Sequence, residues 1–178
     1  MRRAATIVSM LVGAGCSNGV PLAPSPVQTS SNTPQESILS GAYVLTFEAD
    51  SECKSLPAGV RERSYSALLG AEVAELTGAR FAEPLSGYPA WNVLYVREAG
   101  DVATLYFSDP EIWELIDDDS YLVLLGSATG VVDRTTSRLV MSGTFRYCRA
   151  KEPDPYPECA VPEITCLSSH HTVTVSRN

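Results

Sequence analysis

The side chains of this 178-residue chain that could do chemistry form three groups: an acidic run, a pair of histidines and five cysteines. The acidic run contains Asp109, Glu111, Glu114, Asp117, Asp118 and Asp119. Oxygen ligands this closely spaced could bind Ca²⁺, which takes about six to eight of them. The EF-hand pattern of alternating ligands, a central Gly and a closing Glu is missing from the sequence. We therefore expect a solvated helix end and loop here and predict no metal site.

The two histidines, His170 and His171, are neighbours in the sequence. Adjacent residues of a strand point to opposite faces of a sheet, so the two imidazoles cannot bind one metal ion. We expect one to face the interior and the other the solvent. Nucleophile-elbow, P-loop, dinucleotide-binding and H-E-x-x-H motifs are all missing from the sequence. The sequence therefore predicts no catalytic residue, no cofactor and a protein that is not an enzyme.

The candidates for a ligand site are aromatic side chains and one arginine: Tyr43, Phe47, Trp91, Tyr95, Tyr106 and Arg146. The aromatic residues could line a cavity or fill the core of a small barrel, and core filling is the favoured interpretation. Charged residues on strands usually face solvent, which is the expectation for Glu48, Arg61, Arg63 and Arg97. If one charge faces the interior, Arg146 is the best candidate, because Phe145 and Tyr147 have the opposite parity. An inward guanidinium could bind an anionic ligand through paired hydrogen bonds.

The first sixteen residues have the organisation of an export signal. Arg2 and Arg3 precede an apolar stretch at 4–12, which is too short to span a bilayer and is typical of a cleavable signal peptide. The stretch ends in Leu-Val-Gly-Ala-Gly-Cys at 11–16. This segment resembles the lipobox of bacterial lipoproteins, with Gly13 at the position where the family usually has leucine.

The resemblance implies that residues 1–15 are a lipoprotein signal peptide and that Cys16 becomes a lipidated N-terminus, carrying acyl chains such as palmitate. Two or more chains give stable attachment to a membrane. By analogy with lipoprotein sorting in Gram-negative bacteria, Ser17 points to the outer membrane, with the domain in the periplasm or at the cell surface. The alternative is an ordinary secretory signal followed by a cysteine that takes no part in anchoring.

Beyond the lipidated cysteine, the chain divides into a tether at 16–37 and a single domain at 38–178. The tether contains four prolines and many Ser, Thr, Asn and Gln residues, without apolar periodicity, which is typical of a flexible linker. The domain consists of short runs in which apolar and polar residues alternate. Strands are expected at 42–48, 61–69, 72–81, 91–97, 102–107, 121–132, 138–147 and 172–176.

One short helix is expected at about 109–116, because Ser108 and Asp109 can cap it and Pro110 suits the first helical position. The eight strands fit an all-β domain, either a closed up-and-down barrel or a β-sandwich. Hairpin-like connections favour the barrel, since closure also removes exposed edges. Gly-Ala-Tyr at 41–43 is similar to the Gly-x-Trp that opens the first lipocalin strand, and Asp-Ser-Tyr at 119–121 is similar to the lipocalin Thr-Asp-Tyr element. The resemblance implies a lipocalin-like barrel.

The cysteines fit this barrel as two disulfides. Lipidation of Cys16 leaves Cys53, Cys148, Cys159 and Cys166, an even set suited to an oxidising compartment. If the last strand pairs with the first, Cys53 after the first lies near Cys166 before the last. This pairing is the first choice and leaves Cys148–Cys159 to close the proline-rich loop, although four cysteines allow three connectivities. The wide spacings do not resemble those of a zinc site.

The net charge of −8 argues against a nucleic-acid partner. We therefore expect a lipid-anchored, non-catalytic envelope lipoprotein that binds a small or lipophilic molecule inside its barrel. The alternative is a structural or interaction module with a filled barrel that contacts another envelope protein or a glycan. An open interior with Ala67, Gly126 and Gly143 facing inward would favour the first function. A packed interior and an exposed apolar patch would favour the second.

Overall fold

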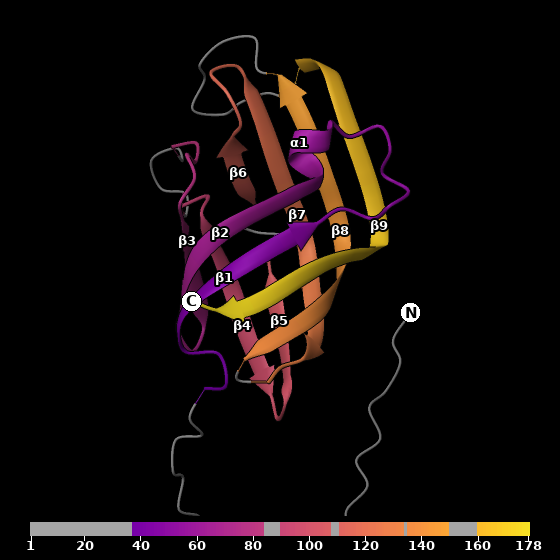
Figure 1. Ribbon diagram of the computed structural model, residues 1–178. Helices are drawn as coiled ribbons and strands as arrows, with labels where there is room; N and C mark the ends of the chain where they lie inside the picture. Colours follow the sequence, from indigo (N-terminus) through magenta and orange to yellow (C-terminus); the bar gives the residue numbers. More distant parts are fainter. Residues whose placement is uncertain (1–36, 84–89, 108–110, 134, 150–159) are drawn as a thin grey trace, which may run out of the picture. The chain divides into compact units, whose positions relative to one another are not determined.

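The computed structural model describes residues 37–83, 90–107, 111–133, 135–149 and 160–178, with side chains described from Glu163 in the last segment (Figure 1). The lipidation signal, Cys16, nearly all of the tether, Asp109 and Cys159 lie outside the described residues. Among the described residues, no helix is long and apolar enough to cross a membrane.

The described chain consists almost entirely of antiparallel strands. They are β1 (Gly41–Glu48), β2 (Glu62–Leu69), β3 (Val73–Thr77), β4 (Val93–Ala99), β5 (Val102–Tyr106), β6 (Ile112–Leu115), β7 (Ser120–Val131), β8 (Thr136–Arg149) and β9 (Ala160–Arg177). A single turn of helix, α1 (Ala58–Arg61), lies between β1 and β2. These bounds agree with most of the expected strands, and β1, β2, β3 and β5 have the period-two burial that the sequence predicts.

Eight of the strands form a closed up-and-down barrel in the order β1, β2, β3, β4, β5, β7, β8 and β9 (Figure 1). The first and last strands close the ring, with Leu45 opposite Val175. On the far side, β5 pairs directly with β7 and places Leu105 opposite Ala128. The expected barrel is therefore confirmed, and the β-sandwich alternative is wrong. Strand β6 is a ninth strand outside the ring, paired with the first part of β7.

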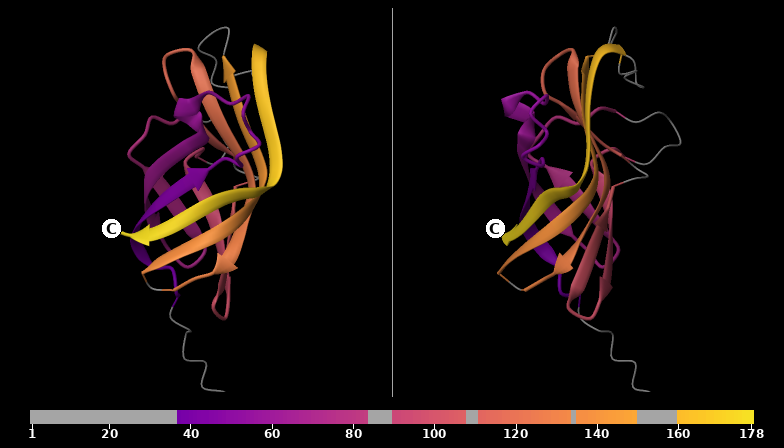
Figure 2. Two further views of the ribbon diagram at one scale, coloured as in Figure 1. Left: turned by 45° about the vertical axis from the view of Figure 1, so that its right-hand side comes forward. Right: turned by 90° about the vertical axis from the view of Figure 1, so that its right-hand side faces the viewer.

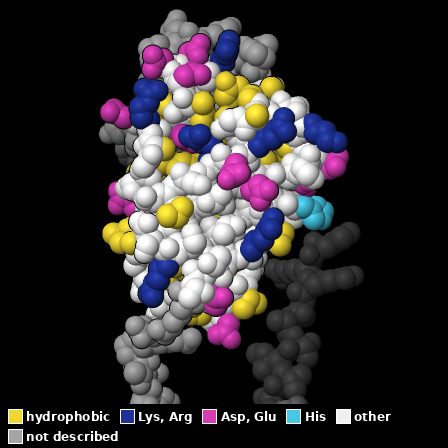
Figure 3. Space-filling model, in the orientation of Figure 1, with side chains coloured by type: hydrophobic (Ala, Val, Ile, Leu, Met, Phe, Trp, Pro, Cys, Tyr) yellow, Lys and Arg dark blue, Asp and Glu magenta, His cyan; other side chains and the backbone are white. Residues whose placement is uncertain are grey.

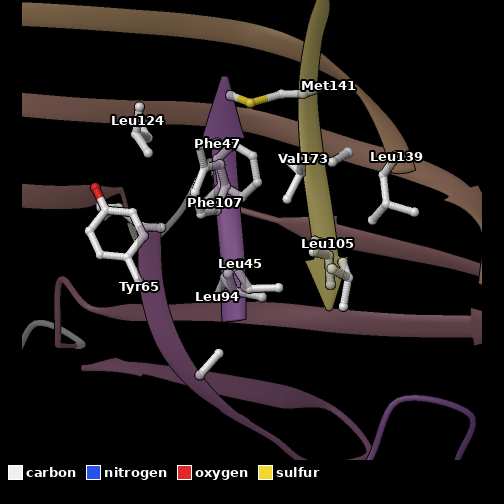
Figure 4. Packing of buried hydrophobic residues seen from close by; sticks show 14 of the residues in the cluster. Leu45, Phe47, Tyr65, Leu94, Leu105, Phe107, Leu124, Leu139, Met141 and Val173 are labelled. Atoms are coloured by element: carbon white, nitrogen blue, oxygen red, sulfur yellow. The ribbon is translucent and has the colours of Figure 1, made fainter. Parts of the chain in front are cut away.

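The barrel interior is filled by one cluster of buried apolar side chains contributed by all eight strands of the ring (Figure 4). On β1, the buried residues Tyr43, Leu45 and Phe47 alternate with more exposed neighbours. The ring of Phe47 meets those of Tyr65 and Phe107 edge-on, with centroids 5.6 and 5.5 Å apart. Such edge-to-face contacts are the preferred geometry of aromatic pairs and leave little free space between the rings.

The three longest strands, β7, β8 and β9, bend sharply along one line across the sheet (Figure 2). Gly126 on β7 lies opposite Gly143 on β8, and their backbones approach so closely that a Cβ on Gly143 would lie 2.1 Å from the Leu125 carbonyl oxygen. Gly126 also has φ of +137°, a conformation that disfavours other residues. Next to Gly143, the β8–β9 register shifts by a bulge that ends at His171. Of the three positions expected to face inward in an open barrel, Ala67 does face the core. Gly126 and Gly143 instead allow the strands to bend.

The bend divides these strands into two parts with different partners. On one side, which we call the lower part, β9 pairs with β1 through Thr172–Arg177 and β7 pairs with β5 through Ser127–Val131. On the other side, the upper part, β7 pairs with β6 and β9 pairs with β8 alone among the described strands. The upper part is therefore a sheet that extends beyond the closed ring, with α1 at the same end (Figure 1).

The predicted helix at 109–116 is wrong, because residues 112–115 form strand β6. This run is apolar on both faces, since Ile112 enters the barrel core and Trp113 packs on the outer face. A short run of this kind satisfies helical and strand periodicity equally well. Helix α1 was not predicted, and β9 extends far beyond the expected 172–176.

The close approach of the two glycines makes a prediction about stability. Gly143→Ala should lower the free energy of unfolding by about 3 kcal/mol, because its Cβ would collide with backbone atoms that cannot move independently. Gly59→Ala is the matched control, since a Cβ there meets no atom within 4 Å and alanine favours the helix. Chemical denaturation measures both changes. Equal effects of the two substitutions would contradict the proposed constraint at the bend.

Candidate functional site

The six residues predicted for a ligand site lie in three separate places. Tyr43 and Phe47 are in the barrel core, as the core-filling interpretation expects. Tyr95 and Tyr106 lie opposite each other on the outer face of β4 and β5, where Tyr95 is exposed and Tyr106 is partly buried. Trp91 belongs to a second cluster outside the ring. The structure therefore brings these aromatic residues to no common cavity, and the expectation that Trp91, Tyr95 and Tyr106 fill the barrel core is wrong.

Arg146 does not face the interior. It lies opposite Val123 on β7, whereas its neighbour Phe145 is fully buried in the barrel core. The side chains of β8 therefore alternate in the sense opposite to the one considered for an inward arginine, with Phe145 inward and Arg146 outward. The reason is that Phe145 faces the core together with Leu139 and Met141. These residues lie on both sides of the register shift next to Gly143 and point the same way.

The pair Tyr95 and Tyr106 borders a surface pocket of about 420 Å³. The guanidinium of Arg97 lies over the Tyr106 ring, 5.6 Å from its centroid. Glu98 also lines this pocket, but its carboxylate already accepts hydrogen bonds from the backbone N–H groups of Ile38 and Leu39, at 2.9 and 2.8 Å. Glu98 therefore fastens the beginning of the domain to the barrel.

The outer face of the upper sheet carries the second cluster, in which Trp91, Trp113, Tyr121, Val123 and Cys148 are buried. The rings of Trp91 and Trp113 are 5.3 Å apart, and Tyr121 meets Trp113 edge-on at 6.4 Å. Strand β6 contributes Trp113 to this cluster because it pairs with β7 in register, Trp113 opposite Val123. The cluster gives the upper sheet a buried layer of its own outside the ring.

Beside this cluster is a pocket of about 230 Å³ on β7, β8 and β9. Its lining residues are Val123, Leu125, Thr144, Arg146, Glu163 and Thr165. The Arg146 guanidinium lies over the Trp113 ring, 5.5 Å from its centroid, and near the carboxylates of Glu111 at 3.5 Å and Glu163 at 3.8 Å. We call this the Arg146 pocket. Its polar side chains are held in place by one another and by the aromatic cluster.

On the face seen in Figure 1, hydrophobic side chains gather at the end where α1 lies, between basic residues (Figure 3). Tyr147 and Ile164 are partly buried against the core and are on the inner side of the upper sheet by strand alternation.

Glu48, Arg61 and Arg97 are exposed, as expected for charged strand residues.

Glu114 is the one member of the acidic run that is buried among the described residues, with 1% of its side chain exposed. Arg63 on β2 donates from Nε to Oε2 of Glu114 at 2.9 Å and from its Nη2 to the other oxygen. The Tyr65 hydroxyl donates to Oε2 at 2.7 Å. Both carboxylate oxygens therefore have partners, and the cost of burying the charge is offset.

This network changes the titration of Arg63 and Tyr65. Hydrogen bonding to Glu114 raises the pKa of Arg63, and burial followed by the nearby carboxylate raises the pKa of Tyr65 well above its ordinary value. Arg63 therefore stays charged and Tyr65 neutral, and their hydrogen bonds to Glu114 join β2 to β6. The exposed residues Asp117, Asp118 and Asp119 do form the solvated turn that the sequence predicts. The sequence does not distinguish the buried Glu114 from these exposed carboxylates, because residues 109–116 are expected from their pattern to form a helix.

The two histidines point in opposite directions, as predicted: His171 is fully buried and His170 is exposed. Nδ1 of His171 accepts a hydrogen bond of 2.8 Å from the Asp50 backbone N–H, so Nε2 carries the proton and can donate to the Gly143 carbonyl at 3.2 Å. His171 thereby joins the loop after β1 to the bend of β8. Burial lowers the pKa of His171 below its ordinary value.

Ser168, Asp50 and His170 lie close together but in an order that does not activate a serine nucleophile. The Ser168 hydroxyl donates to the Asp50 carboxylate, and no imidazole nitrogen accepts its proton among the described contacts. The Ser168 hydroxyl, followed by the Glu52 backbone N–H, lowers the pKa of Asp50. The arrangement fastens the loop 49–57 to β9.

The same loop is fastened covalently by Cys53–Cys166, with Cα atoms 5.7 Å apart, which confirms the first-choice pairing. A cross-link between residues 113 positions apart restricts the unfolded chain strongly. Cys148 is disulfide-bonded as well, and Cys159, the partner that the sequence predicts for it, lies outside the described residues.

Comparison of the chain with protein-family models, with curated proteins and with solved structures finds no match. The function of the two surface pockets must therefore be argued from their own geometry. The resemblances to lipoproteins and to lipocalins stay predictions from the sequence.

The buried ion pair makes a prediction about stability. Arg63→Met should lower the free energy of unfolding by about 3 kcal/mol, because it leaves the Glu114 carboxylate buried with only Tyr65 as partner. Arg80→Met is the control, since Arg80 and Asp118 form an exposed pair at 3.3 Å that should contribute less than about 1 kcal/mol. Urea denaturation compares the two. Similar small losses in both variants would show that the Glu114 network does not stabilise the fold.

The buried imidazole makes the stability depend on pH. Because the folded-state pKa of His171 lies below its ordinary value of about 6.5, the unfolded chain binds more protons between the two values. The free energy of unfolding should therefore fall as the pH drops below about 7, by up to about 1.4 kcal/mol per pH unit. His171→Gln should remove this decline above pH ~5, and His170→Gln should keep it. A decline that persists in His171→Gln would assign the effect to another group.

Proposed function

We propose that this protein is a lipid-anchored protein of the bacterial envelope whose barrel is a non-catalytic binding module that works through its outer surface. The observation that carries the proposal is the contrast between the two sides of the barrel wall. Among the described residues, the inside is occupied by one apolar cluster, whereas the outer surface carries pockets of about 420 and 230 Å³.

A lipophilic molecule inside the ring would have to displace packed side chains such as Phe47, Phe107 and Leu105, which are fully buried. Removing a side chain of this size from a core costs about 2–5 kcal/mol. An interior ligand would therefore have to offset that loss before it bound at all. This argument favours the interaction module over the lipocalin-like carrier.

The buried polar groups support a non-catalytic role. Among the described residues, Glu114 is the buried carboxylate and His171 the buried imidazole, and each has its hydrogen-bonding atoms occupied by protein partners. They join separate elements of the barrel to one another. Neither pocket on the outer surface is lined by a histidine or by a nucleophile paired with a base.

Membrane anchoring is supported by the Leu-Val-Gly-Ala-Gly-Cys segment at 11–16 and by the cysteine count. Cys53, Cys166 and Cys148 are all disulfide-bonded, which suits an oxidising compartment outside the cytoplasm. Acyl chains on Cys16 would hold the domain at a membrane, where a partner in the same envelope is within reach of its outer surface.

Mass spectrometry of the chain extracted from bacterial membranes tests both parts of the proposal. The denatured chain should have the mass of a protein that begins at Cys16 and carries acyl groups, and the Cys16→Ser variant should lack them. Under native conditions the chain should retain no stoichiometric apolar ligand beyond its acyl groups. An unmodified Cys16 would refute the anchor, and a retained apolar molecule would restore the carrier function.

A further inference from the structure

The Arg146 pocket has a composition that selects a class of ligand, and the inference rests on the proposed binding function. Its apolar part is formed by the half-buried Leu125 on β7, beside the buried Val123. Its polar part consists of Arg146, Glu163 and two threonines on β8 and β9. Leu167, which follows in line on β9 opposite Thr144, is 75% exposed and extends the apolar surface at the edge.

The polar side chains of this pocket are oriented before any ligand arrives. Arg146 is held between the Trp113 ring and the carboxylates of Glu111 and Glu163. Glu163 in turn accepts a hydrogen bond of 3.1 Å from the Thr165 hydroxyl. Because their positions are already fixed, these groups lose little conformational freedom when they bind a ligand.

The charges of the pocket exclude an anion. One guanidinium faces two carboxylates, at 3.5 and 3.8 Å, so the group carries a net charge of about −1. A phosphate or carboxylate ligand would be repelled by Glu111 and Glu163 while it competed with them for Arg146. This removes the anionic ligand for which Arg146 was considered from the sequence.

The size and polarity of the pocket also exclude a lipid chain. A volume of about 230 Å³ that is open to solvent and bordered by charged and hydroxyl groups cannot enclose an acyl chain. The pocket instead suits a compact molecule that has an apolar face and a polar rim. A pyranose ring has both, because its C–H groups form one face and its hydroxyl groups lie around the edge.

We propose that the Arg146 pocket binds one sugar ring of a neutral glycan. The C–H face of the ring packs on Leu125, and hydroxyl groups at its edge form hydrogen bonds with Arg146, Glu163 and Thr144. Charged partners strengthen such hydrogen bonds relative to neutral ones. The glycan can continue along the exposed side chain of Leu167.

Saturation-transfer NMR on the full mature chain, in a detergent without a sugar headgroup, tests the proposal with glucose, galactose and N-acetylglucosamine as probes. At least one of these neutral sugars should receive saturation, and glucuronate should receive clearly less. Arg146→Met should lower affinity for the neutral sugar about fivefold or more, the effect of losing a hydrogen bond to a charged group. Arg138→Met is the matched control, because it removes an exposed arginine that lines neither pocket and should leave binding unchanged.

Thr144→Val removes a hydroxyl group but keeps the size of the side chain, and it should weaken binding as well. This second variant keeps the test valid if Arg146→Met does not fold. Absence of saturation for all three neutral sugars, stronger binding of glucuronate, or equal losses in Arg146→Met and Arg138→Met would each overturn the sugar assignment. These outcomes test only the assignment of a sugar to the pocket. The proposed binding function would fail on a different result, the retention of an apolar ligand inside the barrel.

Discussion

The close contact between the Gly126 and Gly143 backbones is the constraint on which the rest of this structure depends. It lets β7 and β8 bend together, and the bulge that ends at His171 lets β9 follow. Without this bend, strands of 12, 14 and 18 residues could not both close a small ring and continue beyond it. One line of residues therefore separates a filled barrel from an extended sheet.

The two parts are stabilised in different ways. The ring depends on hydrophobic packing around Phe47 and Phe107, whereas the upper end combines its own aromatic cluster with polar and covalent contacts. Glu114 joins β6 to β2, and His171 and the Cys53–Cys166 disulfide fasten the loop after β1. The upper end thereby becomes rigid enough to present a pocket with oriented side chains on its outer face.

Much of the ring could be predicted from the sequence, because alternating burial fixes the strands and hairpin-like connections fix their order. The Cys53–Cys166 pairing followed from closure of the ring, and the opposite directions of His170 and His171 followed from strand geometry. Prediction failed above the bend. There, residues 112–115 are apolar on both faces, and the orientation of Arg146 depends on which face of β8 is buried. The buried position of Glu114 depends on Arg63, 51 residues away, which no local pattern reveals.

The proposed function requires a filled barrel whose partners bind from outside. Titration with benzene, followed by NMR on the wild-type chain and on Leu105→Ala, tests whether the interior is filled. Leu105 is fully buried, so its truncation should open a dry cavity that accepts benzene, as apolar cavities in proteins do. Benzene should therefore bind to Leu105→Ala and not to the wild type. Saturable binding of benzene inside the wild-type barrel would show that the barrel has room for a ligand.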